Sequence, residues 1–243
     1  MSDALEVKDI RFSYTGMPVL KRISFSVPKG GMFVITGRSG CGKSTLLEIC
    51  SSQRTPESGT ISWEGGNIAE LSHDGLVRAR TRIGFVFQKH ALIHNFRIYD
   101  NIALPLRYHR DLSERDVRAT VKAVMEELGL FNVDTKFPNE CTAAQACCAA
   151  IARAVVMYPS LLFLDEPTAG VDPVTARGIA NVLLEMNATR GIAIVMASNM
   201  VAILKGLKCP ITVLDNGELF NYTDPARAQS GVSDMFSTLR DAL

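Results

Sequence analysis

The 243-residue chain has the length of one large domain or two small ones, which is enough to bury a sizeable hydrophobic core. Its 26 Lys and Arg residues nearly balance 25 Asp and Glu residues, and 47% of all residues are hydrophobic. This composition is typical of a globular protein. It argues against a disordered chain and against the basic surface of a nucleic-acid-binding protein.

The N-terminus and the cysteines are typical of a soluble, cytosolic protein. The first ten residues include acidic side chains and lack the apolar segment of a signal peptide. The longest apolar stretch, residues 192–204, is interrupted by Ser198 and Asn199, so no transmembrane helix is expected. The six cysteines lack the paired spacing of a zinc site, and we expect them to be reduced thiols.

The first ninety residues are rich in predicted strands. Apolar and polar residues alternate over residues 7–14 and 23–27, as expected for half-buried strands. Residues 32–36 form a compact apolar run bounded by glycines, which is typical of a fully buried strand.

The middle of the chain, from about residue 89 to residue 158, is predicted to be helical. Ser113 is a candidate N-cap with an acidic residue three positions later, and Gly129 is a candidate helix end. Apolar residues at positions 117, 121, 124 and 128 share one face of the helix between them.

Predicted strands and helices alternate after Pro159. Residues 161–164 and 192–196 read as buried strands, and Asp172 and Pro173 supply the N-cap and the first residue of a helix between them. This alternation predicts a largely parallel sheet. Near the end, two short strands flank a turn and predict a β-hairpin: residues 211–214, Asp215-Asn216-Gly217 and residues 218–220.

A glycine-rich sequence directly follows the predicted strand at 32–36. It fits G-x-x-x-x-G-K-[ST] between a strand and a helix, which is the context that this motif requires. Glycines let backbone N–H groups surround phosphates, Lys43 reaches the β and γ phosphates, and the Ser44 hydroxyl is left for Mg²⁺. The residues predicted to bind nucleotide here are Gly37, Ser39, Gly40, Cys41, Gly42, Lys43, Ser44 and Thr45.

Two adjacent carboxylates follow the predicted strand at 161–164. Asp165 would hold Mg²⁺, and Glu166 would polarise the attacking water. Adjacent acids at a strand end are often only a solvated turn, but the apolar run before them and the glycine-rich motif favour chemistry. The two motifs together predict the binding of a nucleoside triphosphate with Mg²⁺.

With Gln88 and Ala169-Gly170-Val171-Asp172 added to these motifs, the chain resembles the ATP-binding subunit of an ABC transporter over essentially its whole length. The resemblance implies that Tyr14 stacks on adenine, that Gln88 joins Mg²⁺ or water to the permease contact, and that Asp172 crosses a dimer seam. It also implies an Mg²⁺-dependent ATPase, peripheral at the cytoplasmic face of the inner membrane. Its partners would be a second ATP-binding subunit, identical or different, and transmembrane permease subunits.

The fold that the resemblance implies is α/β, a P-loop ABC-type nucleotide-binding domain that spans residues 1–243. Residues 1–88 and 159–220 would form the ATPase core with an antiparallel β subdomain. Residues 89–158 would form an inserted helical subdomain, and residues 221–243 a short C-terminal tail.

The family's LSGGQ signature falls on Cys141-Thr142-Ala143-Ala144-Gln145, where only Thr142 and Gln145 keep their chemistry. In the family this loop presents a hydroxyl and backbone N–H groups to the ATP bound on the other subunit, so the resemblance assigns both residues to that contact. Ala143 and Ala144 add Cβ atoms where the family's glycines bring the backbone close to phosphate.

Ser198 stands where the family has its switch histidine, and the resemblance assigns it to the nucleotide site. A hydroxyl can contact phosphate, but it cannot orient Glu166 and water as an imidazole does. Losing one such group commonly costs ~10² to 10³ in rate, so we expect slow hydrolysis with less effect on binding. The alternative is a catalytically impaired, nucleotide-gated structural subunit. A soluble DNA-repair or translation ATPase would need insertions or a second cassette, for which this length leaves no room.

The predicted helical region also resembles the lipid-transport branch of the family. Residues 87–92 and 95–107 are similar to ATPases of mammalian-cell-entry (Mla-type) systems, which move phospholipids between bacterial membranes. The pattern N-I-A-x-P-L also occurs in importers of methionine and in lipoprotein-release systems, and an ordinary helical core would explain the apolar positions as well. The resemblance implies phospholipid as the cargo and a lipid-binding accessory protein as a further partner.

Overall fold

An antiparallel sheet is built from strands in the first third of the chain. The computed structural model describes residues 3–200, 209 and 211–221. The strand order in this sheet is β2-β1-β4-β5, and neighbouring strands are antiparallel. Its strands are β1 (Leu5–Tyr14), β2 (Met17–Val27), β4 (Ser58–Trp63) and β5 (Gly66–Asn67).

A second, six-stranded sheet forms the centre of the molecule, in the order β10-β9-β3-β8-β7-β6. All neighbouring pairs are parallel except β9 and β10, which form the predicted hairpin. Every residue of β7 and β8 is buried, because helices or the other sheet cover both faces. The strands are β3 (Met32–Thr36), β6 (Ile83–Val86), β7 (Leu161–Asp165), β8 (Ala193–Ala197), β9 (Ile211–Asp215) and β10 (Glu218–Asn221).

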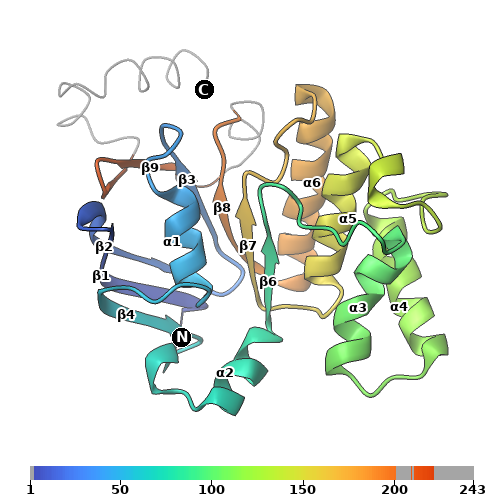
Figure 1. Cartoon of the computed structure of the whole chain (residues 1–243), viewed down its shortest axis with the longest axis horizontal. Helices are drawn as coiled ribbons and strands as arrows, with labels where there is room; N and C mark the ends of the chain where they lie inside the picture. Colours follow the sequence, from blue (N-terminus) through green and yellow to red (C-terminus); the bar gives the residue numbers. More distant parts are fainter. Residues whose placement is uncertain (1–2, 201–208, 210, 222–243) are drawn as a thin grey trace.

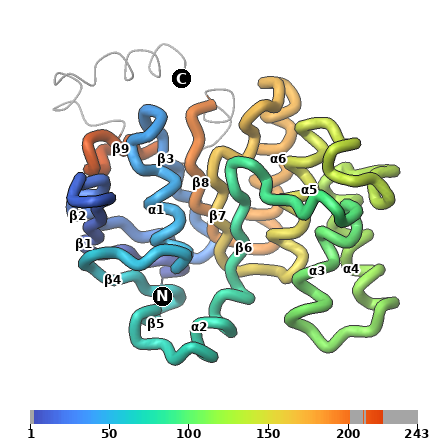
Figure 2. Tube along the Cα trace, in the orientation of Figure 1, coloured from blue at the N-terminus to red at the C-terminus, as the bar shows by residue number. Residues whose placement is uncertain are grey.

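Two hydrophobic cores lie on the two faces of this central sheet. Alternate side chains of one strand belong to different cores: Val34 packs with the helices, and Ile35 packs with α1 and the antiparallel sheet. Figures 1 and 2 show α3 to α6 on one side of the central strands and α1 on the other. The helices are α1 (Lys43–Cys50), α2 (His73–Arg80), α3 (Ile98–His109), α4 (Glu114–Glu127), α5 (Ala143–Val155) and α6 (Pro173–Arg190), with 3₁₀ turns η1 (Ile68–Glu70) and η2 (Pro138–Glu140).

The predicted helix ends are confirmed by their hydrogen bonds. The Ser113 hydroxyl accepts the N–H of Asp116 at the start of α4, and Gly129 follows the end of that helix at φ +67°. At the start of α6, the Asp172 carboxylate accepts two backbone N–H groups, and Pro173 is the first helical residue.

The α/β fold class and the parallel central sheet are likewise confirmed, but the reading of the first ninety residues as strands missed α2. No residue of α2 is buried, and only Leu76 and Ala79 pack partly against a hydrophobic core, so its apolar stripe is short and weak. The predicted tail lies almost wholly outside the described residues, as do positions 201–204 of the apolar stretch. The division of the chain into a core and an inserted helical subdomain stays a prediction.

Candidate active site

The glycine-rich loop between β3 and α1 needs glycine at two positions. Gly37 has φ +155°, and a Cβ there would lie 2.3 Å from the carbonyl oxygen of Leu214. Gly42, the N-cap of α1, has φ +107°, and its Cβ would lie 2.8 Å from a methyl carbon of Val19. The loop therefore curls tightly enough for its N–H groups to surround an anion only because these residues lack side chains.

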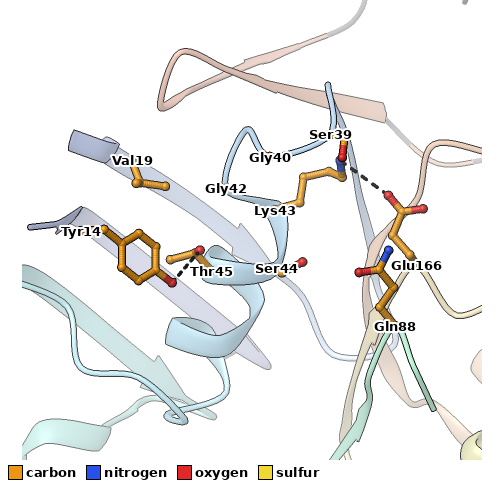
Figure 3. A pocket seen from close by; sticks show the side chains of 10 residues that line it. All are labelled: Tyr14, Val19, Ser39, Gly40, Gly42, Lys43, Ser44, Thr45, Gln88 and Glu166. Carbon is orange, nitrogen blue, oxygen red and sulfur yellow. Dashed lines mark hydrogen bonds and ion pairs between the residues drawn. The ribbon is translucent and has the colours of Figure 1, made fainter. Parts of the chain in front are cut away.

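Lys43 connects this loop to the carboxyl end of β7. Its Nζ donates to the carbonyl oxygens of Gly37 at 2.8 Å and Arg38 at 3.2 Å, and it lies 3.6 Å from Oε1 of Glu166. The Lys43 side chain is only 6% exposed, whereas that of Glu166 is 21% exposed. Figure 3 shows the ion pair spanning the space between the loop and the end of β7.

Asp165, the last residue of β7, is buried with one unsatisfied oxygen. Within the described part of the chain, its Oδ1 has no hydrogen-bond partner. Burial raises the pKa of Asp165 and the neighbouring Glu166 adds to this, while a hydrogen bond with Ser44 opposes it. A buried carboxylate oxygen beside a hydroxyl suits Mg²⁺, which prefers oxygen ligands and takes the others from phosphates and water.

Among the residues that the structure describes, no group of three or more His, Cys, Asp or Glu side chains could hold a metal ion by itself. A Mg²⁺ ion that enters with a nucleotide needs no such cluster.

Glu166 is held in a conformation that is rare for a residue with a side chain. Its φ is +44°, in the left-handed region. Its N–H donates to the carbonyl oxygen of Ala197 in β8, and its own carbonyl accepts the N–H of Ala169. Gln88, two residues after the end of β6, lines the same pocket as Glu166, and Figure 3 shows the two side chains next to each other.

A pocket of about 220 Å³ unites these parts of the chain. Of the predicted loop residues, Gly37 and Cys41 lie in the loop without lining the pocket, and burial raises the pKa of the Cys41 thiol. The lining residues come from β1, β2, the loop, α1 and the segments after β6 and β7: Tyr14, Val19, Ser39, Gly40, Gly42, Lys43, Ser44, Thr45, Gln88 and Glu166.

Tyr14 stands at the rim of this pocket, 42% exposed. Its hydroxyl lies 3.3 Å from the Thr45 hydroxyl, and its ring meets Phe12 edge-on with centroids 4.9 Å apart. The guanidinium carbon of Arg54 lies 5.1 Å from the Tyr14 ring centroid, a cation–π distance. Three neighbours thus orient the ring, and the sequence pattern identified only one of them, Thr45.

Four other predicted nucleotide-binding residues do not line this pocket: Thr142, Gln145, Asp172 and Ser198. At the start of α5, the Thr142 hydroxyl accepts the Gln145 N–H at 3.2 Å, and the Gln145 side chain accepts the Thr142 N–H at 3.0 Å. Their polar groups are thus engaged in a capping box. Hydrogen bonds with Thr175 lower the pKa of Asp172.

Ser198 is 1% exposed, and its hydroxyl accepts the N–H of Met200 at 3.2 Å. The adjacent Asn199 contacts the loop instead: its Oδ1 accepts the N–H of Gly37 and the hydroxyl of Thr36, each at 3.2 Å. Asn199 is a supporting residue that sequence analysis missed, because its contact joins segments far apart in the chain.

Comparisons with known proteins agree with this geometry. The chain matches the ABC transporter family over residues 20–169. It is 33% identical over 201 residues to the intermembrane phospholipid transport system ATP-binding protein MlaF of Escherichia coli (strain K12), covering 83% of this chain and 75% of that protein. It is 35% identical over 205 residues to the methionine import ATP-binding protein MetN of Ralstonia nicotianae, covering 84% and 58%.

Solved structures share the fold. The dimeric structure of MJ0796, a bacterial ABC transporter cassette, gives a TM-score of 0.82 at 27% identity, covering 88% of this chain and 96% of that one. A post-hydrolysis state of the same cassette, bound to ADP and Pi, gives 0.81 at 26% identity with the same coverage.

Proposed function

Because the chain belongs to the ABC transporter family and is an ABC-type ATPase, we propose that it drives phospholipid transport by a membrane permease. The similarity to the phospholipid transport protein MlaF and the family-like residues 87–92 and 95–107 support this cargo. Methionine import is the second candidate, because the chain is also similar to MetN, at 35% identity over 205 residues.

The observation that carries the catalytic proposal is the meeting of Lys43 and Glu166 across the pocket, at 3.6 Å. In the proposed site Lys43 exchanges its two loop carbonyl partners for phosphate oxygens, and Glu166 holds the attacking water through its carboxylate. Ser44, Asp165 and Gln88 would hold Mg²⁺, which neutralises charge on the phosphates.

Slow hydrolysis is part of the proposal. The Thr142 hydroxyl and the Gln145 side chain only accept in the capping box of α5, so both keep their hydrogens for a partner's nucleotide. The departure that slows hydrolysis here is Ala143 and Ala144, whose Cβ atoms stand at the helix start that would approach that nucleotide. Ser198 lies buried away from the pocket lining and supplies no group there in this conformation. If these features abolish hydrolysis entirely, the chain is the nucleotide-gated structural subunit instead.

We further propose a second ATP-binding subunit and permease subunits as partners. No helix among the described residues is long and apolar enough to span a membrane. In this proposal the chain attaches at the cytoplasmic face through its contact with the permease.

The proposal is tested on the chain purified with the membrane proteins that it retains, reconstituted in liposomes. Transfer of a fluorescent phospholipid should require Mg²⁺ and ATP, and Glu166→Gln should abolish both transfer and ATP turnover. If methionine stimulates ATP turnover and no lipid is transferred, the proposed cargo is methionine and not phospholipid. Equal inactivity of wild type and Glu166→Gln, with ATP binding retained, would establish the structural subunit.

A further inference from the structure

The carbonyl oxygen of Pro167, directly after Glu166, accepts two side-chain hydrogen bonds from different parts of the chain. Cys147 in α5 donates from Sγ at 3.0 Å, and His90, two residues after Gln88, contacts it from Nε2 at 3.1 Å. A carbonyl oxygen can only accept, so Nε2 of His90 carries the hydrogen in this contact. Cys147 is fully buried, and burial raises the pKa of its thiol, so Sγ keeps the hydrogen that it donates.

The segment that presents His90 is itself fixed to α5. Arg153 donates to the carbonyl oxygens of His90 at 2.9 Å and Ala91 at 2.7 Å. Both residues have positive φ, +60° and +48°, which is a strained backbone for side chains of this kind. One helix thus holds the segment after Gln88 through Arg153 and the segment after Glu166 through Cys147.

The two hydrogen bonds to the Pro167 carbonyl oxygen constrain Glu166 because the two residues are adjacent in the chain. The proline ring fixes φ of Pro167 near −65° and restricts the residue before it, so ψ of Pro167 is the only freely rotating backbone angle between the bonded carbonyl and Glu166. Glu166 has φ +44°, a conformation that persists only where its surroundings enforce it. Neither His90 nor Cys147 lines the nucleotide pocket, so they can affect chemistry only through that backbone.

We propose that His90 and Cys147 are positioning residues, which hold Glu166 in its left-handed conformation across from Lys43. This inference rests on the proposed catalytic role of Glu166. It makes the geometry of that carboxylate depend on both the segment that follows Gln88 and the first half of α5.

The test compares ATP turnover of the partner-bound complex for wild type and the double variant His90→Ala/Cys147→Ala. We expect kcat to fall by about 10-fold or more, because small displacements of a catalytic group have large effects, while KM for ATP changes less than about 2-fold. Adding back one donor, as His90→Ala/Cys147→Ser or His90→Gln/Cys147→Ala, should restore part of kcat. Cys148→Ala, a substitution of the adjacent cysteine in the same helix, is the matched control and should keep wild-type kcat.

Glu166→Gln in the same preparation separates the catalytic role of Glu166 from the positioning role of His90 and Cys147. If Glu166→Gln keeps turnover, the proposed catalytic role of Glu166 is wrong, and the positioning inference that rests on it is overturned as well. If it loses turnover while the double variant keeps wild-type kcat, only the positioning inference is overturned. A double variant whose kcat and KM change together with a lower Tm, and which neither added donor restores, would show a purely structural role and also overturn it.

Discussion

At the scale of single residues, Lys43 combines near-complete burial with contacts to two carbonyl oxygens and one carboxylate. Lys43→Ala removes the cation that the proposal aims at phosphate. Charge-assisted hydrogen bonds of this kind contribute about 1.5 to 3 kcal/mol, so we predict that affinity for Mg²⁺-ATP falls about 10- to 100-fold in calorimetry. Undiminished affinity in a folded variant would refute the phosphate assignment.

For Asp165 we predict a substitution that raises stability. Burial raises the pKa of its carboxyl above the ordinary value of 3.8, so the folded chain holds this proton more tightly than the unfolded chain. The free energy of unfolding therefore decreases as pH rises from 3.8 through the higher pKa of the folded chain. Asp165→Asn removes the buried charge, and we predict that Tm at pH 7.5 in EDTA rises by about 2 to 4 °C.

The pH dependence supplies the control for Asp165→Asn. The gain in Tm should shrink as the pH of the comparison is lowered toward 3.8, because the folded wild type then takes up the proton that neutralises its buried carboxylate. Mg²⁺-ATP should stabilise the wild type more than the variant, since the variant lacks the proposed metal ligand. A lower Tm for the variant in EDTA would contradict the account of a buried, unsatisfied carboxylate.

Residue patterns identified the groups that we propose to carry chemistry, but not the residues that contact the backbone near them. Lys43 and Glu166 were predicted from local motifs, and the fold brings them to 3.6 Å. Asn199, His90 and Cys147 act on backbone atoms of distant segments, and no local spacing encodes such contacts.

At the scale of elements, the start of α5 is the clearest departure from the family. Ala143 and Ala144 are its first two residues, and the Thr142 capping box closes its N-terminus. Substituting glycine at both positions removes two Cβ atoms and lets the helix end approach a phosphate more closely. We predict higher ATP turnover for Ala143→Gly/Ala144→Gly, with a loss of about 1 kcal/mol of stability for each glycine.

Ser198, which stands where the family has its switch histidine, can be tested in the same glycine variant. Ser198 is 1% exposed, so an imidazole there needs the segment after β8 to move. Ser198→His should therefore raise turnover further only in the glycine variant, with Ser198→Ala as its control. No gain in either protein would mean that a partner subunit supplies the missing groups.

Elements were predictable where burial imposes a pattern. The wholly buried β7 and β8 appeared as apolar runs, and α4 and α6 were marked by their caps. By contrast, α2 packs only Leu76 and Ala79 partly against a core, and β5 has two residues, so neither element produces a long apolar pattern in the sequence.

At the scale of the whole molecule, strand order assembles the site. Because β3, β8, β7 and β6 are successive neighbours in a parallel sheet, the segments that follow β3, β7 and β6 meet at one edge. The alternation of strands and helices predicted the parallel sheet but not this order. Convergence of the glycine-rich loop, Glu166 and Gln88 therefore followed from the family resemblance rather than from periodicity.

A mixing experiment tests whether two copies of this chain form each active site. Lys43→Ala disables the pocket of its own chain and leaves its α5 intact. Thr142→Asp keeps a side-chain oxygen for the N-cap of α5, yet places a negative charge where the proposal puts a partner's phosphate. If each site takes its pocket from one chain and α5 from the other, the mixed dimer contains one undamaged site.

We therefore predict that an equimolar mixture of the two variants hydrolyses ATP severalfold faster than the average of the separate proteins. Re-equilibration of the subunits before the assay is necessary, and the same mixture at dilute concentration is the control, because dissociation should abolish the gain. Activity equal to the average would contradict a shared site between identical chains. It would leave a different ATP-binding subunit as the partner, whose own α5 would then cover this pocket.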